Sequence, residues 1–265
     1  MPEGHTIARA AIEQNKLLAG RVVRVSSPQG RFAEGAARID GCVLTSVESY
    51  GKHLFYWWSN GDVGHVHLGL FGKFRVSKGP EAPEPVGMVR MRMQTELATI
   101  DLAGPTDCTI GTREDRAAIL ARLGPDPLRR DAKPEVAIAR MAKSKQPLGA
   151  LLLDQKVLAG IGNVYRAEAL FVNGIHPSRP GAATDVVELQ ALWNTMTAML
   201  RKGVKENRII TVDPRDLDLP KGRRLRRGEA TYVYHRDRCL RCGTVVQTVA
   251  LAGRPCYFCP TCQPH

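Results

Sequence analysis

The sequence predicts an α+β protein of more than one domain, because its first half is β-rich, its second half is helical and its tail is rich in cysteine. Short apolar runs such as RVVRVSS and CVLTSVESYGKHLFYWWS alternate in the first half with turn-forming stretches such as SNGD and GPEAPEP. From Pro134 onward, apolar residues recur at helical spacing. A chain of 265 residues, 43% of them hydrophobic, has enough material for two packed cores.

The chain begins MPEGHTI, and a helix is expected to start there. Gly20 marks the end of this helix. Its apolar residues recur at helical spacing, and they are Ile7, Ala8, Ala11, Ile12 and Leu18. A proline and an acid suit a helix N-terminus. Pro2 and Glu3 therefore have a purely structural explanation on these residues alone.

Four β-rich runs follow the first helix, and the turns between them predict an antiparallel sandwich. The segment REDRAAILARL predicts a short helix that closes this part. The stretch GPDPLRRDAKPE predicts a domain boundary. We therefore divide the chain into an N-terminal domain at 1–123, a linker at 124–133, a helical domain at 134–231 and a cysteine-rich tail at 232–265.

The helical half contains the segment LLLDQKVLAGIGNVYRAEALF, which predicts a helix, two turns and a second helix. Gly160 and Gly162 permit a tight turn, and Asn163 with Val164 begins a helix whose free N–H groups could hold a phosphate. A tight structural turn explains the two glycines equally well. The run KGRRLRRG at 221–228 predicts a mobile basic loop.

The charge of the chain predicts an anionic partner. The net charge is +12, and from Arg201 to His265 there are 14 Lys/Arg against 6 Asp/Glu, a difference of 8. Nucleic acid is the first candidate, and a solvated basic surface is the structural alternative. The sequence has neither an apolar run of about 20 residues nor a signal-peptide pattern, so we expect a cytoplasmic protein with no membrane partner.

The tail CLRCGTVVQTVALAGRPCYFCPTC predicts one structural Zn²⁺. Two C-x2-C pairs supply four thiolates, and a ribbon this short has no core without metal. Five cysteines compete for four places. Cys239 and Cys242 could pair with Cys256 and Cys259 across 13 residues, or with Cys259 and Cys262 across 16. A proline within the CPTC pair shapes a turn and favours the second set.

One charged residue, Lys52, stands out in the β-rich half. Lys52 follows Gly51 in SYGKHLFYWW, a run otherwise suited to burial. A lone lysine near a turn is ordinarily a solvated surface residue.

Five motifs in chain order resemble the formamidopyrimidine-DNA glycosylase and endonuclease VIII family over the whole chain. They are Pro-Glu-Gly at the terminus, Gly-Lys in a hairpin, GPDPL, DQ-x-x-LAGIGN-x-Y-x-x-E and a four-cysteine hairpin containing Arg-Pro. The resemblance implies an N-terminal antiparallel β-sandwich with flanking helices and a C-terminal helix–two-turn–helix domain with a zinc-binding β-hairpin. Damaged DNA would lie between the halves, and the family's hairpin length matches the longer cysteine spacing.

The resemblance also implies the catalytic residues of a bifunctional DNA glycosylase and abasic-site lyase. Pro2, once Met1 is removed, would attack C1′ of the damaged nucleotide with its α-amine. Glu3 would act as general acid and base. Lys52 would contact the phosphate beside the lesion or protonate the sugar, and Arg254 would hold the phosphate beside the lesion.

The remaining roles follow from the same resemblance. Asn163 would contact the DNA backbone, and Glu168 would lie near the N-terminal amine at the DNA-binding site and orient the amine. Leu70 and Phe71 would fill the gap left by the flipped base, although Gly69 stands where a polar residue is expected.

Two other positions depart from the family, and they bear on the substrate. Gly4 is typical of the branch that removes oxidised pyrimidines, but His5 replaces its usual proline, and we expect His5 to be a surface residue at the start of a helix. Cys256 has no family counterpart. We expect a monomer that removes oxidised pyrimidines by β,δ-elimination; the alternatives are an oxidised-purine glycosylase and a non-catalytic zinc-ribbon DNA-binding protein.

Overall fold

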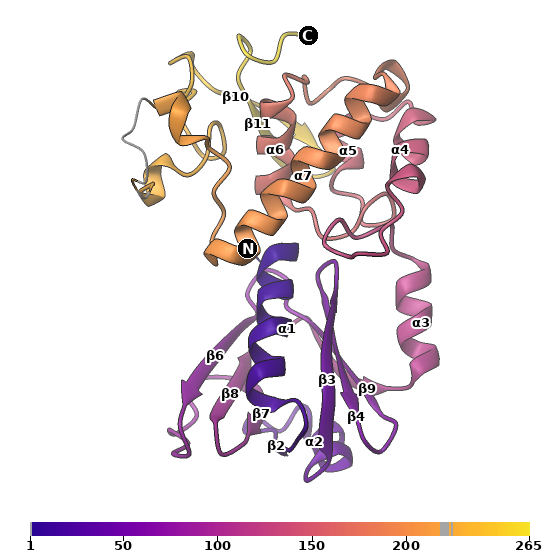
Figure 1. Ribbon diagram of the computed structural model, residues 1–265, viewed down its shortest axis with the longest axis vertical. Coiled ribbons are helices and arrows are strands. Elements are labelled where there is room, and N and C mark those ends of the chain that lie inside the picture. The colour runs from indigo at the N-terminus through magenta and orange to yellow at the C-terminus, as the bar shows by residue number, and fades with distance from the viewer. Residues whose placement is uncertain (1, 218–222, 224) are drawn as a thin grey trace. The chain divides into compact units, whose positions relative to one another are not determined.

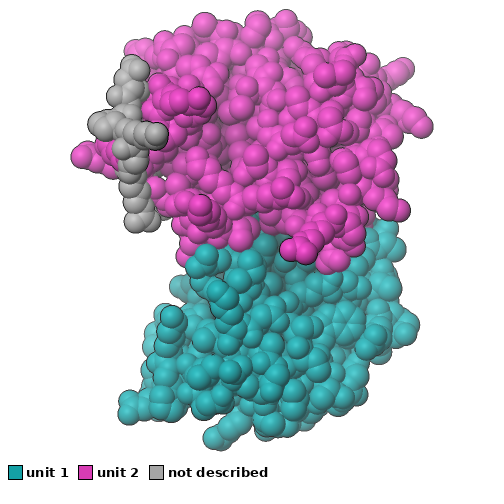
Figure 2. Space-filling view, in the orientation of Figure 1, with its two compact units in different colours: residues 1–122 teal, residues 123–265 magenta. Residues whose placement is uncertain are grey.

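The computed structural model describes residues 2–217, 223 and 225–265, and the chain divides into two compact units (Figures 1 and 2). Unit 1 is Met1–Arg122 and unit 2 is Leu123–His265. The segment 124–133, expected to be a linker, lies within unit 2. Its backbone is paired there, because Gly124 donates a hydrogen bond to the Gln155 carbonyl at 2.8 Å, and Asp126 is buried.

Unit 1 is built from two antiparallel sheets and three helices. One sheet has the strand order β1-β3-β4-β5-β9 and the other the order β2-β7-β8-β6. The elements are α1 (Gly4–Leu18), β1 (Arg21–Val22), β2 (Arg24–Ser26), α2 (Ala33–Ile39), β3 (Val43–Tyr50), β4 (His53–Trp58), β5 (Val63–His67), β6 (Lys73–Lys78), β7 (Val89–Gln94), β8 (Ala98–Ala103), β9 (Asp107–Gly111) and α3 (Arg113–Ala121).

The core of unit 1 lies between the two sheets, which confirms the predicted sandwich. Alternation along β4 buries Leu54, Tyr56 and Trp58 in one cluster with Met93 and Ile100 of the second sheet. Helix α1 packs on β3 and β4. The first helix begins at Gly4 as expected, and α3 matches the predicted closing helix.

Unit 2 is helical and ends in a two-stranded hairpin, in agreement with the predicted fold class. Its main elements are α4 (Pro134–Ala142), α5 (Leu148–Leu151), α6 (Asn163–Val172), α7 (Val186–Glu206), β10 (Gln247–Leu251) and β11 (Arg254–Phe258), with three short 3₁₀ turns at Gly181–Ala183, Pro214–Leu217 and Arg227–Glu229. The helices and the hairpin share one core, in which Tyr165 and Phe171 of α6 are fully buried. A helix, a connection at 152–162 and a second helix, α6, appear where they were predicted.

The hairpin turn of unit 2 requires a special backbone conformation. Leu251 pairs with Arg254, so Ala252 and Gly253 alone form the turn, with φ of 50° and 70°. Two successive left-handed residues match the twist of the flanking strands. Of the predicted basic loop at 221–228, residues 221, 222 and 224 lie outside the described part of the chain. Within the described part, no helix is long and apolar enough to cross a membrane.

Candidate nucleic-acid interface and zinc site

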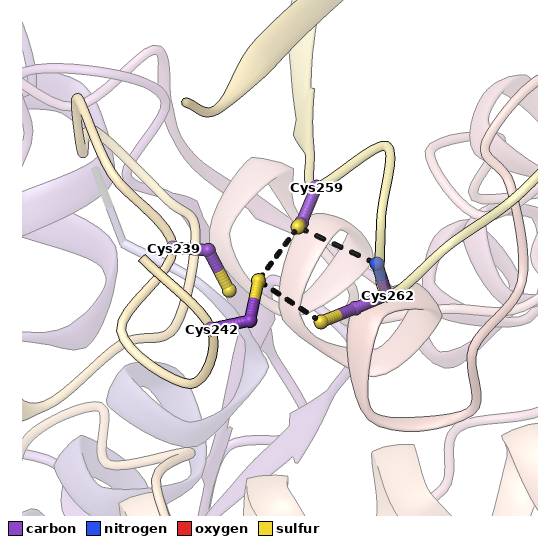
Figure 3. Close-up of side chains that lie close together, drawn as sticks. All are labelled: Cys239, Cys242, Cys259 and Cys262. Carbon is purple, nitrogen blue, oxygen red and sulfur yellow. Dashed lines mark hydrogen bonds between the residues drawn. The ribbon is translucent and has the colours of Figure 1, made fainter. Parts of the chain in front are cut away.

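Four cysteines of the tail converge on one point. The Sγ atoms of Cys239, Cys242, Cys259 and Cys262 all lie within 4.8 Å of one another (Figure 3). Cys242 Sγ lies 3.4 Å from Cys259 Sγ and 3.5 Å from Cys262 Sγ. Zn–S bonds of about 2.3 Å place tetrahedral sulfurs about 3.8 Å apart, so the four thiolates fit one structural Zn²⁺.

The fifth cysteine of the tail lies outside this cluster. Cys256 is the middle residue of β11, fully buried, and pairs with Val249 of β10. Its thiol belongs to the core of unit 2, and burial raises its pKa. The geometry therefore favours the set with the longer linker, in which Cys256 packs and does not bind metal.

Helix α6 and the zinc hairpin are joined by a polar contact at the start of the helix. Asn163, the first residue of α6, donates a hydrogen bond from Nδ2 to the Pro255 carbonyl at 3.1 Å and accepts one from Arg166 at its Oδ1. Arg166 also donates to the carbonyls of Gly149 at 2.8 Å and Leu251 at 3.2 Å. The contact thus holds both strands of the hairpin, one on each side of its turn, against α6.

Arg166 was missed by sequence reasoning, although it lies three residues after Asn163 and so shares a helix face with it. Its side chain is completely buried, so its guanidinium needs acceptors inside the protein. It donates to the Pro255 carbonyl at 3.2 Å and to the Arg254 carbonyl at 3.5 Å. Asn163 is therefore hydrogen-bonded to Pro255, the residue that follows Arg254 in the chain. Asn163 and Arg254 are both predicted to contact DNA.

Glu168 has a different environment from the one expected, and its assignment to DNA binding is corrected. Its carboxylate has no exposed surface. It accepts hydrogen bonds from the backbone N–H groups of Tyr232, Val233 and Tyr234 at 2.7, 2.9 and 2.9 Å, and from the Thr211 hydroxyl. With four donors filling its oxygens, the carboxylate holds the chain that leads into the zinc-binding tail and cannot touch DNA in this conformation.

Burial is also unexpectedly high at the N-terminus. Pro2 is partly exposed, whereas Glu3 has no exposed surface, and its carbonyl accepts the first hydrogen bonds of α1 from Thr6 and Ile7 at 2.9 and 3.3 Å. His5 was expected at the surface, but only 6% of it is exposed, so that prediction is wrong. Burial lowers the pKa of His5 from 6.5 to about 4 and keeps the imidazole neutral.

Lys52 lies in the two-residue turn between β3 and β4, after Gly51 with φ of 56°. Beside it, three histidines that sequence reasoning missed share the outer face of the larger sheet. His53 pairs with His67 across β4 and β5, and His53 Nδ1 lies 2.9 Å from His65 Nε2. Burial, followed by neighbouring positive charge, lowers the pKa of His53 to about 3.

The turn between β5 and β6 carries two exposed apolar side chains. Leu70 is 53% exposed and Phe71 84% exposed, which suits groups meant to enter a base stack. Gly69 has φ of 63°, and a Cβ there would lie 1.9 Å from the Thr106 hydroxyl oxygen. A side chain at position 69 would therefore clash with the Thr106 hydroxyl where it now lies.

Comparisons with known proteins cover the whole chain. Residues 1–106 match the formamidopyrimidine-DNA glycosylase N-terminal domain, residues 123–214 its H2TH domain, and residues 236–264 a zinc finger found in FPG and IleRS. The chain is 46% identical over 269 residues to Endonuclease 8 1 of Mycobacterium tuberculosis, covering 99% of this chain and 100% of that protein.

Two further similarities agree with this match. The DNA-(apurinic or apyrimidinic site) lyase Nei2 of Mycolicibacterium smegmatis is 35% identical over 268 residues, covering 99% of each chain. The structure of Lactococcus lactis Fpg in complex with DNA containing an abasic site superposes with a TM-score of 0.81 at 20% identity, covering 99% of this chain and 100% of that one. At this identity the structural match establishes the fold.

Proposed function

The chain belongs to the formamidopyrimidine-DNA glycosylase and endonuclease VIII family, and we propose that it is a bifunctional DNA glycosylase and abasic-site lyase of base excision repair. The full-length match to an Endonuclease 8 at 46% identity carries this proposal. A lyase of the same family, 35% identical over its whole length, supports the second activity. We expect it to act as a monomer on damaged DNA in the bacterial cytosol.

The proposed nucleophile is the α-amine of Pro2 after removal of Met1. Such amines have pKa values of about 7.7–8.0, so a useful fraction is neutral near pH 7. The nitrogen lone pair forms a bond to C1′ while the bond from C1′ to the base breaks and the electron pair leaves with the base. The sugar ring then opens at O4′, and loss of the amine proton gives an iminium ion between Pro2 and C1′.

Glu3 and Lys52 supply the proton and the positive charge that these steps need. The Glu3 carboxyl directly follows the nucleophile in the chain, which suits a group that delivers a proton to O4′. The Lys52 ammonium stabilises the phosphate beside the lesion. Once the iminium ion forms, the 2′ proton becomes acidic, so the 3′ and then the 5′ phosphate can be eliminated.

DNA is held by groups from both units in this proposal. Asn163 and Arg254 lie on adjoining backbone and offer an amide and a guanidinium to phosphates. Leu70 and Phe71 occupy the space left by the flipped base, which reduces the cost of a few kcal/mol for unstacking it. Zn²⁺, bound by the four tail cysteines, stabilises the hairpin that carries Arg254 and takes no part in the chemistry.

Gly4 favours oxidised pyrimidines as the substrate, and the experiment includes both lesion classes. The chain beginning at Pro2 is incubated with duplexes that contain thymine glycol, 5-hydroxyuracil, 8-oxoguanine or an abasic site, with and without borohydride. We expect strand cleavage at the pyrimidine lesions and a borohydride-trapped adduct whose peptide map ends at Pro2. A matched chain that retains Met1 should give neither product.

The alternatives predict different results in the same assay. Preferential cleavage at 8-oxoguanine would identify an oxidised-purine enzyme. Binding without cleavage or trapping would identify a non-catalytic DNA-binding protein. An adduct on Lys52 would overturn the assignment of Pro2 while leaving the glycosylase activity in place.

A further inference from the structure

Three histidines and an aspartate lie together on the outer face of the larger sheet of unit 1. His53, His67 and Asp107 are directly opposite one another on the neighbouring strands β4, β5 and β9. His65 lies two residues before His67 on β5, so its side chain is on the same face. The register of the sheet therefore gathers three imidazoles and one carboxylate at one place.

The three imidazole rings lie close to one another. His53 Nδ1 is 2.9 Å from His65 Nε2. The centre of the His53 ring is 5.1 Å from that of His65 and 4.8 Å from that of His67. All three histidines are half-buried and Asp107 is exposed, so water reaches the group while the sheet supports it from below.

The distance between the two facing nitrogens is close to the one that a metal ion requires. Zn–N bonds of about 2.0–2.1 Å place two nitrogens of a tetrahedral site about 3.3 Å apart. The nitrogens of His53 and His65, at 2.9 Å, would have to separate by about 0.4 Å. One of them carries the proton of their contact. Transfer of that proton through water to the far nitrogen of the same ring leaves both lone pairs for the ion.

The third imidazole has to turn to complete the site. Within the described residues, the tail cysteines alone already bring three or more ligand atoms within 4.8 Å of one another. The χ2 torsion of histidine is broad, so the His67 ring can rotate at low cost. Directly opposite residues such as His53 and His67 have Cβ atoms about 4.5–5.5 Å apart, which allows two imidazoles to reach one ion. Asp107 could then bind the ion or accept the remaining N–H of His67.

The surroundings of the histidines are compatible with a cation. Burial lowers the pKa of each imidazole and keeps it neutral, which is the form that binds metal. The carboxylate of Asp107 places a negative charge beside His65 and His67 and raises their pKa values. Lys52 and Arg122 act in the opposite direction. Arg122 is exposed, so water and salt screen its charge from an ion at the histidines.

We propose that these three histidines bind a second Zn²⁺ ion, together with the carboxylate of Asp107. This goes beyond the proposed function, because the ion is separate from the zinc of the tail and takes no part in the cleavage steps. It binds reversibly and more weakly than the tail zinc, since imidazoles have to rearrange whereas the four thiolates already converge. An ion there would fix the first residue of β4, which directly follows Lys52.

The test is a calorimetric titration of the full chain with Zn²⁺, after dialysis that leaves one zinc per chain at the tail. His53→Gln and His65→Gln each remove one ligand, and Asp107→Asn removes the negative charge while keeping the shape of the side chain. His265→Gln is the matched control, because His265 belongs to another imidazole pair, with its ring centre 4.7 Å from that of His176. Thermal melting without added zinc verifies that each variant folds.

We expect the wild type to bind one further Zn²⁺ per chain. Asp107→Asn should weaken this binding about tenfold, and each histidine variant by at least as much, because even a partner of a metal-bound histidine commonly contributes about 10- to 100-fold to affinity. His265→Gln should bind as the wild type does. No saturable binding beyond the tail zinc, or an equal loss in His265→Gln, would overturn the inference. Binding is measured without DNA and is therefore independent of the proposed function.

Discussion

Asn163 donates its side-chain amide proton to the carbonyl oxygen of Pro255 over 3.1 Å, across 92 residues of sequence. This hydrogen bond joins the first residue of α6 to the strand that carries Arg254. The same hydrogen bond therefore helps to position both proposed DNA-binding residues, Asn163 and Arg254. Arg166 strengthens it from the buried side, because the guanidinium contacts both the Asn163 side chain and the Pro255 carbonyl.

Asn163→Ala is expected to weaken binding to DNA with an abasic site while zinc is retained. The change removes the bond to Pro255 and an acceptor for Arg166, and each lost hydrogen bond costs about 1 kcal/mol. A total of about 1–2 kcal/mol corresponds to about 5- to 30-fold in Kd, measured by fluorescence anisotropy. Asn173→Ala, at the other end of α6, is the matched control, and an equal loss there would contradict the role of Asn163.

Zinc content distinguishes the two possible sets of cysteines. Cys262→Ser should lose the metal and unfold the tail, because Cys262 lies in the four-sulfur cluster. Cys256→Ser should keep one zinc per chain, with a lower melting temperature caused by the buried hydroxyl. Elemental analysis of the purified variants measures the metal. The reverse pattern would establish the shorter linker and would move Arg254 out of its assigned place.

Lys52→Ala and Arg254→Ala should each reduce lesion cleavage about 10- to 100-fold, since a hydrogen bond to a charged group contributes about 1.5–3 kcal/mol. The melting temperature should change little, because both side chains are partly exposed. Each change should also reduce the slope of log K against log salt by about 1. Lys78→Ala, an exposed lysine at the end of β6, is the control. Wild-type cleavage by both variants would refute their assignment.

Gly69→Ala should destabilise unit 1 by more than the usual cost of a left-handed residue, which is about 1–2 kcal/mol. The added Cβ would lie 1.9 Å from the Thr106 hydroxyl oxygen, so either the turn between β5 and β6 or the Thr106 side chain must shift. Gly87→Ala is matched to it, since Gly87 has φ of 79° and no atom within 4 Å of the new Cβ. Urea unfolding measures the difference, and equal losses in the two variants would exclude the clash with Thr106.

The buried His5 should make the protein less stable in acid. Its folded pKa of about 4 lies below the unfolded value of 6.5, so the unfolded chain binds the proton first as pH falls. The unfolding free energy should therefore decrease between pH 6.5 and about 4, with His5 contributing at most about 3 kcal/mol. His5→Gln should show a shallower decrease in urea unfolding over this range. If the unfolding free energy falls equally with pH in the wild type and in His5→Gln, this prediction for His5 is contradicted.

Several features could be predicted from the sequence because their causes are local. The apolar run HLFYWW in SYGKHLFYWW predicts a buried strand, and Gly51 before Lys52 predicts the turn that precedes it. The C-x2-C spacing brings each pair of thiolates within reach of one metal ion. The helix that begins at Asn163 follows from the two glycines before it, which interrupt the preceding helical pattern.

The tertiary structure alone decided which groups are buried and what they contact. Glu168 receives the N–H groups of Tyr232, Val233 and Tyr234, which are 64 to 66 residues away, and these bonds remove it from the DNA-binding surface. The exclusion of Cys256 from the zinc cluster depends on how β11 packs into the core. Local spacing predicts the helix or strand on which a side chain lies. It does not predict which distant backbone groups will form hydrogen bonds with that side chain, because those contacts depend on long-range packing.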